Sequence, residues 1–478
     1  MNINQKFKKL IKHPLITLLC CWFVIVWSWT FFTDSLDLAG SKIVALVIAS
    51  FVTVLNVGIS ALIVVKTFRY LSKKFVKSKT WKIILIGLPI FSLMDFLISW
   101  VTAIIWIGPQ GSIDNVLPLG SPTLLLIITP LRYASRFVGF YGLAGFFWLI
   151  IFLFIQKPKS KNNIRTLKTT CGALIILSLF GWWLYKDPNG ISIKSTVISE
   201  TLSQRVGDMS NRGSELVIFP EYGLEKIDNS NLDERLPKND DGSKTYFVGS
   251  RQVFDNRPAG HINRLMFGNN IDGITDEQDK SRLIPGGEDL SYLVRLGLRA
   301  TNNKETLDYF SINKMVNKGH IPLKPMKLND QTILGSAVCS SIISPKDYQD
   351  FTKQGATILT NSASLSIFKG SRIFSWQQKS LAKFMAVANT RYFLQSANSA
   401  SAYVLDNNGN QRAETKDINA IDVIAKTNTN KTLYTILGEY LVAIGSLIVA
   451  WWLITYLRLQ YSKLKNKKNG SYVNKTKK

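Results

Sequence analysis

Long apolar segments are the feature of this sequence that most restricts its fold. Five of them precede residue 190, at about 14–33, 43–65, 83–107, 137–156 and 169–185, and a sixth covers 433–457. A helix needs about 20 apolar residues to cross the hydrocarbon core of a membrane. We therefore expect six crossings. The first segment should stay in the mature chain, because its apolar run is long and no small-residue cleavage site follows it.

Lysine and arginine gather beside these segments instead of spreading along the chain. The formal net charge is +26, and the basic stretches are MNINQKFKKLIKH, FRYLSKKFVKSKTWK, QKPKSKNNIRTLK and the tail RLQYSKLKNKKNGSYVNKTKK. The stretches TDSLDLAGS and IGPQGSIDNVLPLGSP contain neither residue. Basic loops stay on the cytoplasmic side of a membrane. The charge pattern thus favours a multi-pass protein of the cell membrane with both termini in the cytoplasm, and it argues against nucleic-acid binding.

The side of each loop fixes how often the chain crosses between residues 122 and 156. One crossing is required there, so the preceding PTLLLIITPLRYASR should lie at the outer interface or re-enter, broken by Pro130. The predicted organisation is an N-terminal transmembrane region of about five spans plus this interfacial or re-entrant segment (1–186), an extracytoplasmic domain (187–431), a C-terminal transmembrane helix (432–457) and a basic cytoplasmic tail (458–478).

The domain between the last two spans alternates strand and helix patterns. Short strands are predicted at SELVIFPE, KTYFVGSR, QTILGSAVCS, GATILTNSA, TRYFLQSAN and SAYVLDN, and helices at SPKDYQDFTKQG and SWQQKSLAKFMAVANT. Continuous apolar runs such as ELVIF are typical of strands covered on both faces. We therefore expect a layered α/β domain.

Three polar residues follow predicted strands in this domain. Glu221 comes after Pro220, and a partly desolvated carboxylate there has the raised pKa of a general base. Lys280 precedes the turn Pro285-Gly286-Gly287-Glu288 and can aim an ammonium at an oxyanion. Cys339 ends an apolar strand, where backbone amides at a helix start would lower the pKa of a thiol. Taken singly, each residue also fits a role without catalysis. Glu221 could be a glutamate in a surface turn, Lys280 a solvated lysine and Cys339 a buried thiol.

Other residues that carry chemistry are sparse. Cys20, Cys21 and Cys171 lie inside apolar segments, which leaves Cys339 as the one cysteine of the polar domain. The three histidines, His13, His261 and His320, are too scattered along the chain for a zinc site. The sequence contains no metal or nucleotide motif, so we expect no cofactor.

Taken together, the glutamate, lysine and cysteine resemble the triad of the nitrilase, or carbon-nitrogen hydrolase, superfamily. A domain of this kind between N-terminal spans and one C-terminal span resembles the apolipoprotein N-acyltransferase family. TNSAS, SWQQ and TRYFLQSANSA are similar to that family's NDAWF, WQH and GRPLLRSTNNG segments. The resemblance covers about residues 80–457 and implies an α-β-β-α sandwich domain beside a polytopic α-helical membrane region.

The resemblance also implies roles for individual residues. Glu221 would be the general base, Lys280 the oxyanion stabiliser and Cys339 the nucleophile, supported by Glu288 of the glycine-rich turn and by Ser340 and Asn361. Where the family usually has an aromatic residue and a glutamate after the cysteine, this chain has Ser340 and Ser341.

The implied reaction moves a fatty acyl chain from a membrane phospholipid, through a cysteine thioester, to the α-amine of the diacylglyceryl-cysteine of a lipoprotein. The partners would be the phospholipid donor, the lipoprotein acceptor and membrane lipids. A membrane-anchored amidase and a non-catalytic lipoprotein- or lipid-binding relative are the alternatives. Apolar loop tips at Leu283-Ile284 and Ile367-Phe368 would either dip into lipid or pack on the domain's own core.

Overall fold

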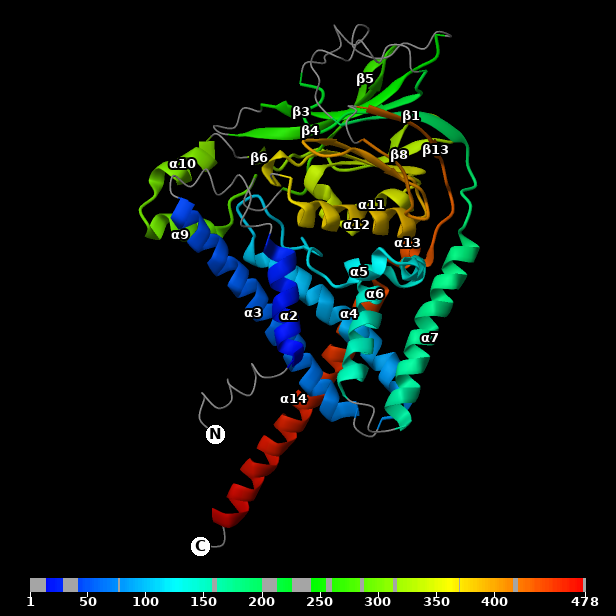
Figure 1. Cartoon of the computed structure of the whole chain (residues 1–478). Coiled ribbons are helices and arrows are strands. Elements are labelled where there is room, and N and C mark those ends of the chain that lie inside the picture. Colours follow the sequence, from blue (N-terminus) through cyan, green and yellow to red (C-terminus); the bar gives the residue numbers. More distant parts are fainter. Residues whose placement is uncertain are drawn as a thin grey trace.

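The computed structural model describes most of the chain. The described residues are 14–28, 42–75, 78–156, 161–199, 213–225, 242–254, 260–283, 288–312, 316–368, 370–415 and 420–475. Membrane helices form one half of the molecule and two β-sheets the other (Figure 1).

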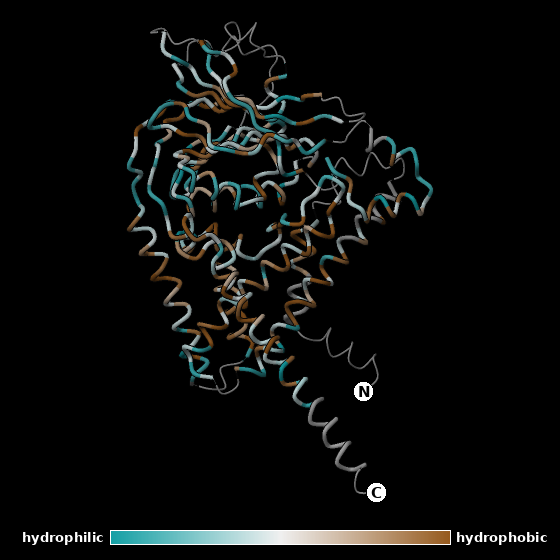
Figure 2. Tube along the Cα trace, turned by 180° about the vertical axis from the view of Figure 1, so that it is seen from behind, coloured by the Kyte–Doolittle hydropathy of each residue, from teal (hydrophilic) through white to brown (hydrophobic). Residues whose placement is uncertain are grey.

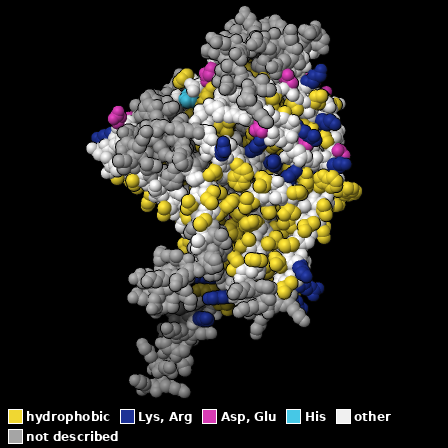
Figure 3. Space-filling view, viewed as in Figure 1, with side chains coloured by type: hydrophobic (Ala, Val, Ile, Leu, Met, Phe, Trp, Pro, Cys, Tyr) yellow, Lys and Arg dark blue, Asp and Glu magenta, His cyan; other side chains and the backbone are white. Residues whose placement is uncertain are grey.

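Five helices in the described part of the chain are long and apolar enough to cross a membrane. The candidate spans are Thr53–Phe75, Thr80–Ile105, Pro130–Ile155, Asn162–Leu184 and Tyr440–Lys463. They correspond to five of the six predicted crossings. The first predicted crossing, 14–33, extends beyond the described residues, and its described helix is the 14-residue α2 (Pro14–Trp27). Apolar residues dominate the lower half of the trace (Figure 2), and on the face drawn in Figure 3 an apolar area with Lys and Arg at its edges covers this region.

The helices extend beyond the predicted spans in two places. Helix α3 (Lys42–Phe75) continues through the first half of the predicted loop FRYLSKKFVKSKTWK, and α4 (Thr80–Ile105) begins before that loop ends. Helix α14 (Tyr440–Lys475) continues through most of the predicted basic tail. The reason is the same in both places: Lys and Arg are good helix formers, so a helix can continue past the hydrocarbon core into water.

The segment before the fourth span is broken, as the sequence predicts. A short helix, α5 (Thr123–Ile127), is followed by the 3₁₀ helix η3 (Pro130–Ala134), with Pro130 at its start. Helix α6 (Ser135–Ile155) continues from it and is itself interrupted at Gly139. The last of the spanning helices before the domain is α7 (Lys161–Leu184).

Two sheets form the α/β half. The first has the strand order β13-β1-β2-β3-β4-β5, with β6 paired to β4, and the second has the order β12-β11-β10-β9-β8-β7. The first-sheet strands are β1 (Ser192–Ile198), β2 (Leu216–Ile218), β3 (Tyr246–Val253), β4 (His261–Asn269), β5 (Gly273–Asp279), β6 (Val316–Asn317) and β13 (Ala420–Lys426). The second-sheet strands are β7 (Met326–Lys327), β8 (Ile333–Val338), β9 (Ile358–Ser364), β10 (Phe393–Asn398), β11 (Tyr403–Leu405) and β12 (Gln411–Glu414). All six predicted strands and both predicted helices are present.

The two sheets pack face to face through an apolar core. Side chains on the two faces of β8 belong to different cores. Leu334 and Val338 point into the core between the sheets, whereas Ala337 belongs to the core on the opposite face of the second sheet. That opposite face is covered by α11 (Pro345–Lys353) and α12 (Arg372–Asn389). Three layers of the expected α-β-β-α sandwich are thus present. Residues 200–212, which connect β1 and β2, lie outside the described residues.

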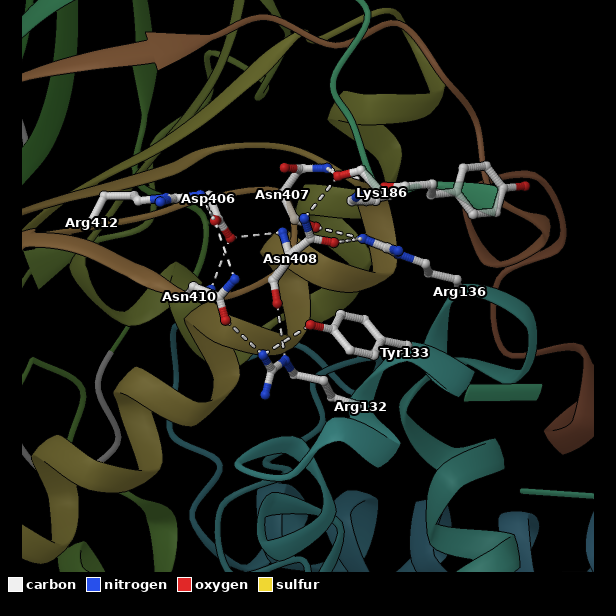
Figure 4. Close-up of polar contacts among 10 residues, drawn as sticks. Arg132, Tyr133, Arg136, Lys186, Asp406, Asn407, Asn408, Asn410 and Arg412 are labelled. Atoms are coloured by element: carbon white, nitrogen blue, oxygen red, sulfur yellow. Dashed lines mark hydrogen bonds and ion pairs between the residues drawn. The ribbon is translucent and has the colours of Figure 1, made fainter. Parts of the chain in front are cut away.

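The layer of α11 and α12 lies directly on the membrane helices (Figure 1). One apolar core runs through both parts, and the Phe140 and Phe384 rings meet edge to face across the junction. Arg136, fully buried, donates hydrogen bonds to the carbonyl oxygens of Val387 (3.1 Å) and Asn407 (2.7 Å). Arg132 reaches the neighbouring turn (Figure 4) and donates to the Asn408 carbonyl at 2.9 Å. These contacts hold the sheets at a fixed place above the membrane helices.

Candidate active site

The ends of three strands meet at one place between the sheets and the membrane helices. Glu221 follows β2, Lys280 follows β5 and Cys339 follows β8. All three side chains are buried. The three predicted triad residues therefore come together, although about 60 residues separate each from the next along the sequence.

Backbone and amide hydrogen bonds position Glu221. Its N–H donates to the Ala363 carbonyl (3.2 Å), and its own carbonyl accepts from Asn398 Nδ2 (2.7 Å). Both partners belong to the second sheet, so the loop after β2 is bound across the gap between the sheets. Asn263 of β4 donates through Nδ2 to Glu221 Oε1. The carboxylate is thereby oriented before any substrate binds.

Lys280 lies between two carboxylates. Its Nζ is 2.9 Å from Glu221 Oε1 and 2.5 Å from Glu288 Oε1. Its backbone N–H donates to the Asn263 carbonyl (2.9 Å), which extends the pairing of β4 and β5 by one residue. Burial alone would lower the pKa of Lys280, but the charges of Glu221 and Glu288 outweigh it and hold that pKa well above its usual range. The ammonium is therefore a permanent cation of the site.

Cys339 begins the 3₁₀ helix η5 (Cys339–Ile343) at a sharp turn from β8. Its φ of +43° lies in the left-handed region, which a side chain with Cβ rarely adopts. Such backbone conformations cluster at functional sites. The thiol is 3.5 Å from the Ser364 carbonyl oxygen and interacts electrostatically with the Glu221 carboxylate.

Electrostatics set the resting protonation of the thiol. Burial, followed by the charge of Glu221, raises the pKa of Cys339 well above its usual value. The expectation that helix-start amides lower this pKa was wrong, because burial and the Glu221 charge raise it. Burial also raises the pKa of Glu221, while the Lys280 charge opposes that shift. A neutral thiol beside a carboxylate base is an arrangement for proton transfer at the moment of attack.

The three predicted supporting residues adjoin the triad in different ways. Glu288 touches Lys280, as described. Asn361 of β9 donates through Nδ2 toward the Cys339 carbonyl (3.4 Å) and to Gln395 Oε1 (3.0 Å), while Tyr348 OH donates to its Oδ1 (3.1 Å). The Ser340 hydroxyl donates to the Arg282 carbonyl, which ties η5 to the loop after Lys280. The turn Pro285-Gly286-Gly287 lies outside the described residues.

A small cleft lies between the end of α4 and the loops that follow Lys280 and Cys339. Its lining includes Ala103, Trp106, Ile107 and Leu117 from the α4 side, and Arg282, Leu283, Asp289 and Ile343 from the catalytic loops. Leu283 is buried in this wall, and Phe368 is buried and stacked on Phe374 with ring centroids 3.6 Å apart. These two side chains pack on the domain, so neither is an apolar tip that reaches lipid. Ile284 and the Ile367 side chain lie outside what the structure describes.

Two residues of the site were not predicted from the sequence. Asn263 lies in β4, a strand whose mixed HINRLMFGN pattern gave no prediction, and the strand order β2-β3-β4 brings it near Glu221. Asn398 lies in the strand TRYFLQSAN, which was predicted, but nothing in that pattern points to a partner 177 residues away. Among the described residues, no three His, Cys, Asp or Glu side chains are grouped so that they could hold a metal ion.

Comparisons with known proteins give one sequence relative and several solved structures. No family model matches the chain. Over 111 residues it is 30% identical to "Apolipoprotein N-acyltransferase 1" of Treponema denticola, a match that spans 22% of this chain and 20% of the relative. The chain thus covers about a fifth of that relative's length.

The solved structures are similar to this chain at low identity. A carbon-nitrogen hydrolase superfamily protein of Xanthomonas campestris is 13% identical with a TM-score of 0.33, and covers 49% of this chain and 91% of its own. Nit3 of Saccharomyces cerevisiae, a nitrilase superfamily member, is 12% identical with a TM-score of 0.35, and covers 52% and 94%.

Proposed function

We propose that this chain, a divergent relative of the apolipoprotein N-acyltransferases, transfers an acyl chain from a phospholipid to the α-amine of a lipoprotein's diacylglyceryl-cysteine. The observation that carries the proposal is the meeting of Glu221, Lys280 and Cys339 at a buried site beside the ends of membrane helices. A soluble amide or nitrile would need no such position, whereas both substrates of this transfer are held in a membrane.

In the first half-reaction, Cys339 attacks the ester carbonyl of the phospholipid while its thiol proton passes to Glu221. The Lys280 ammonium, with backbone amides near Ser340, stabilises the tetrahedral oxyanion. When the intermediate collapses, the C–O bond breaks and the lysophospholipid oxygen takes the proton from Glu221. An acyl chain remains on Cys339 as a thioester.

In the second half-reaction, the neutral α-amine of the lipoprotein attacks the thioester carbonyl. Glu221 takes a proton from the attacking nitrogen, and the C–S bond breaks as the amide forms. The proton then returns to the Cys339 sulfur, which restores the starting state. Because Glu221 is buried and its pKa is raised, it can accept and return this proton near neutral pH.

The arrangement in the membrane supports transfer to an amine. We place the two sheets on the extracytoplasmic side, where the basic loops predict them, and both termini in the cytoplasm. The cleft between α4 and the catalytic loops then opens at the outer leaflet.

Mass spectrometry of a lipoprotein's N-terminal peptide tests the proposal. Purified protein in phospholipid vesicles should convert a diacylated lipoprotein to the N-acylated form and release one lysophospholipid per product. Cys339→Ala should lower this rate by at least about a thousandfold, because the nucleophile is lost. Cys171→Ala, which changes a cysteine in α7, is the matched control and should keep the parent rate.

Two outcomes would contradict the proposal. If free fatty acid appears without N-acylated peptide, water resolves the thioester and the chain is a hydrolase. If full acylation persists in Cys339→Ala, the nucleophile is wrongly assigned.

A further inference from the structure

Helix α9 (Tyr292–Ala300) starts next to the end of a membrane span. The candidate span of α4 ends at Ile105, and the Ile107 carbonyl accepts a hydrogen bond from the Tyr292 N–H at 2.9 Å. Only two residues of chain separate this bond from the end of the span. The first turn of α9 therefore lies at the depth where the hydrocarbon core gives way to lipid headgroups.

Helix α9 has one buried face and one exposed apolar face. Val294 and Leu298 point toward α10 (Lys304–Ile312) and form a small core with Leu307. On the opposite face, Tyr292 is 57% exposed and Leu296 is 64% exposed. These two residues are four positions apart and so form one stripe along the helix.

The exposed stripe points toward the membrane side of the molecule. Helix α10 lies farther from the membrane helices than α9 does (Figure 1). Since the buried face of α9 is turned to α10, its opposite face is turned toward the membrane helices. Ile113, which is 68% exposed, lies in the loop after α4, and the carbonyl of Ile113 accepts a hydrogen bond from Trp100 Nε1 of α4 at 2.8 Å. An apolar surface of Ile113, Tyr292 and Leu296 thus lies near the end of the span.

We propose that α9 lies in the membrane surface on the side of the sheets, with Tyr292 and Leu296 inserted among the acyl chains. Its sequence YLVRLGLRA contains Arg295 and Arg299 and no acidic residue, which suits the phosphates of anionic lipids. Arg295 and Arg299 follow Tyr292 by three and seven positions and therefore flank the stripe on the same exposed side of the helix. From there their guanidinium groups can reach the headgroups while the apolar side chains insert. The occupant of this face is therefore the bilayer in which the protein itself is embedded.

The placement of α9 also affects the candidate active site, and this part of the inference rests on the proposed function. Asp289 accepts a hydrogen bond from the Gln110 N–H at 3.0 Å, and Glu288 beside it holds Lys280. Residues 288–292 are thus attached to the α4 loop at one end and to an interfacial helix at the other. The insertion of α9 would fix the catalytic loop at the height of the lipid ester.

Spin labels on single cysteines test the position of α9 without any reading of activity. The full chain, with its four native cysteines replaced by serine, is placed in vesicles of phosphatidylethanolamine and phosphatidylglycerol and labelled at Tyr292→Cys or Leu296→Cys. For each label we compare two collision rates. One is with oxygen, which concentrates in lipid, and the other is with a water-soluble nickel complex. Both labels should collide several-fold more with oxygen, relative to nickel, than a label at Ile271→Cys.

Ile271 is the matched control because it is a 60% exposed apolar residue in the turn that leads into β5, a strand drawn at the opposite end of Figure 1 from the membrane helices. Equal nickel access at residues 271, 292 and 296 would overturn the proposal. Shielding of 292 and 296 from both reagents would also overturn it, since the stripe would then be covered by protein. Neither failure bears on the acyl-transfer reaction, which the peptide assay measures separately.

Discussion

The Cys339 thiol shares its buried surroundings with two carboxylates and one ammonium. With Glu221 and Glu288 ionised and Lys280 protonated, the cluster carries one net negative charge before the thiol loses its proton. A resting thiolate would add a second negative charge in a site with little water, which explains the raised pKa of Cys339. The nucleophile is therefore formed only as Glu221 takes the proton.

Glu288→Gln should move the acid limb of the activity profile to lower pH. The Glu288 charge raises the pKa of Glu221, and Glu221 must be ionised to act as the base. Removing that charge lowers the pKa of Glu221, so the base is ionised at lower pH. The pH dependence of the first-turnover acylation rate is the measurement. An acid limb that moved to higher pH in Glu288→Gln would show that Glu288 acts mainly by placing Lys280.

Ser341→Ala should leave the fold intact and raise its stability slightly. Ser341 is fully buried, and its hydroxyl has no hydrogen-bond partner within the described part of the chain. An unsatisfied buried hydroxyl costs about 1 kcal/mol, and alanine removes it. Thermal unfolding in detergent measures the change. Ser340→Ala is the comparison: it should destabilise the protein, because the Ser340 hydroxyl donates to the Arg282 carbonyl.

At the scale of elements, α6 depends on a glycine and on a carboxylate from another helix. Gly139 has a φ of 72° and a ψ of −169° inside the helix, a conformation that only glycine adopts readily. The turn that follows is capped by Glu439, whose Oε1 and Oε2 accept from the Phe140 and Tyr141 N–H groups at 2.8 and 3.0 Å. The start of α14 is thereby joined to the middle of α6.

Gly139→Ala should destabilise the protein by at least about 2 kcal/mol. An alanine Cβ would lie 2.7 Å from Glu439 Oε2, and the backbone would have to leave its present conformation. Gly172→Ala in α7 is the matched control, since nothing lies within 4 Å of an added Cβ there. Helix propensity should make that control neutral or slightly stabilising. Equal unfolding temperatures for the two variants would contradict this account of the break in α6.

Local patterns predicted some elements and not others, for a physical reason. ELVIF and TILGSAV are apolar throughout because both faces of their strands are covered, so they are visible in the sequence. Strands β1 and β13 pair with each other along seven residues although more than 200 residues separate them. Lys194 and Asp422 interrupt their apolar pattern at this sheet edge. No local signal marks such a pairing.

In the candidate site, too, some residues could be predicted from local sequence patterns and others could not. Glu221, Lys280 and Cys339 could be predicted because each directly follows a strand and their order matches a known triad. The hydrogen bonds of Asn263 and Asn398 to Glu221 depend on sheet register and on how the two sheets pack. These contacts appear only once the whole fold is built, and so does the strained backbone of Cys339.

At the scale of the whole molecule, the sheets and the membrane helices are one packed body. The outer face of the second sheet is covered by α11 and α12, and α12 in turn lies on α5 and α6. The fully buried Arg136 joins α6 to α7 as well, because it donates to the Gly181 carbonyl at 2.8 Å. A domain held in this way cannot turn its site away from the lipid, which suits a reaction between two membrane-bound substrates.

The direction of insertion is the property of the whole molecule that the proposed function most depends on. Basic loops predict that the sheets face outward and that both termini lie in the cytoplasm. In a background without native cysteines, Ile271→Cys should therefore react with a membrane-impermeant maleimide in intact cells. Ser471→Cys, in the basic tail, should react only after the membrane is opened. The reverse pattern would put the sheets in the cytoplasm, where they could not reach a lipoprotein after export, and would overturn the proposed acceptor while leaving the triad's chemistry possible.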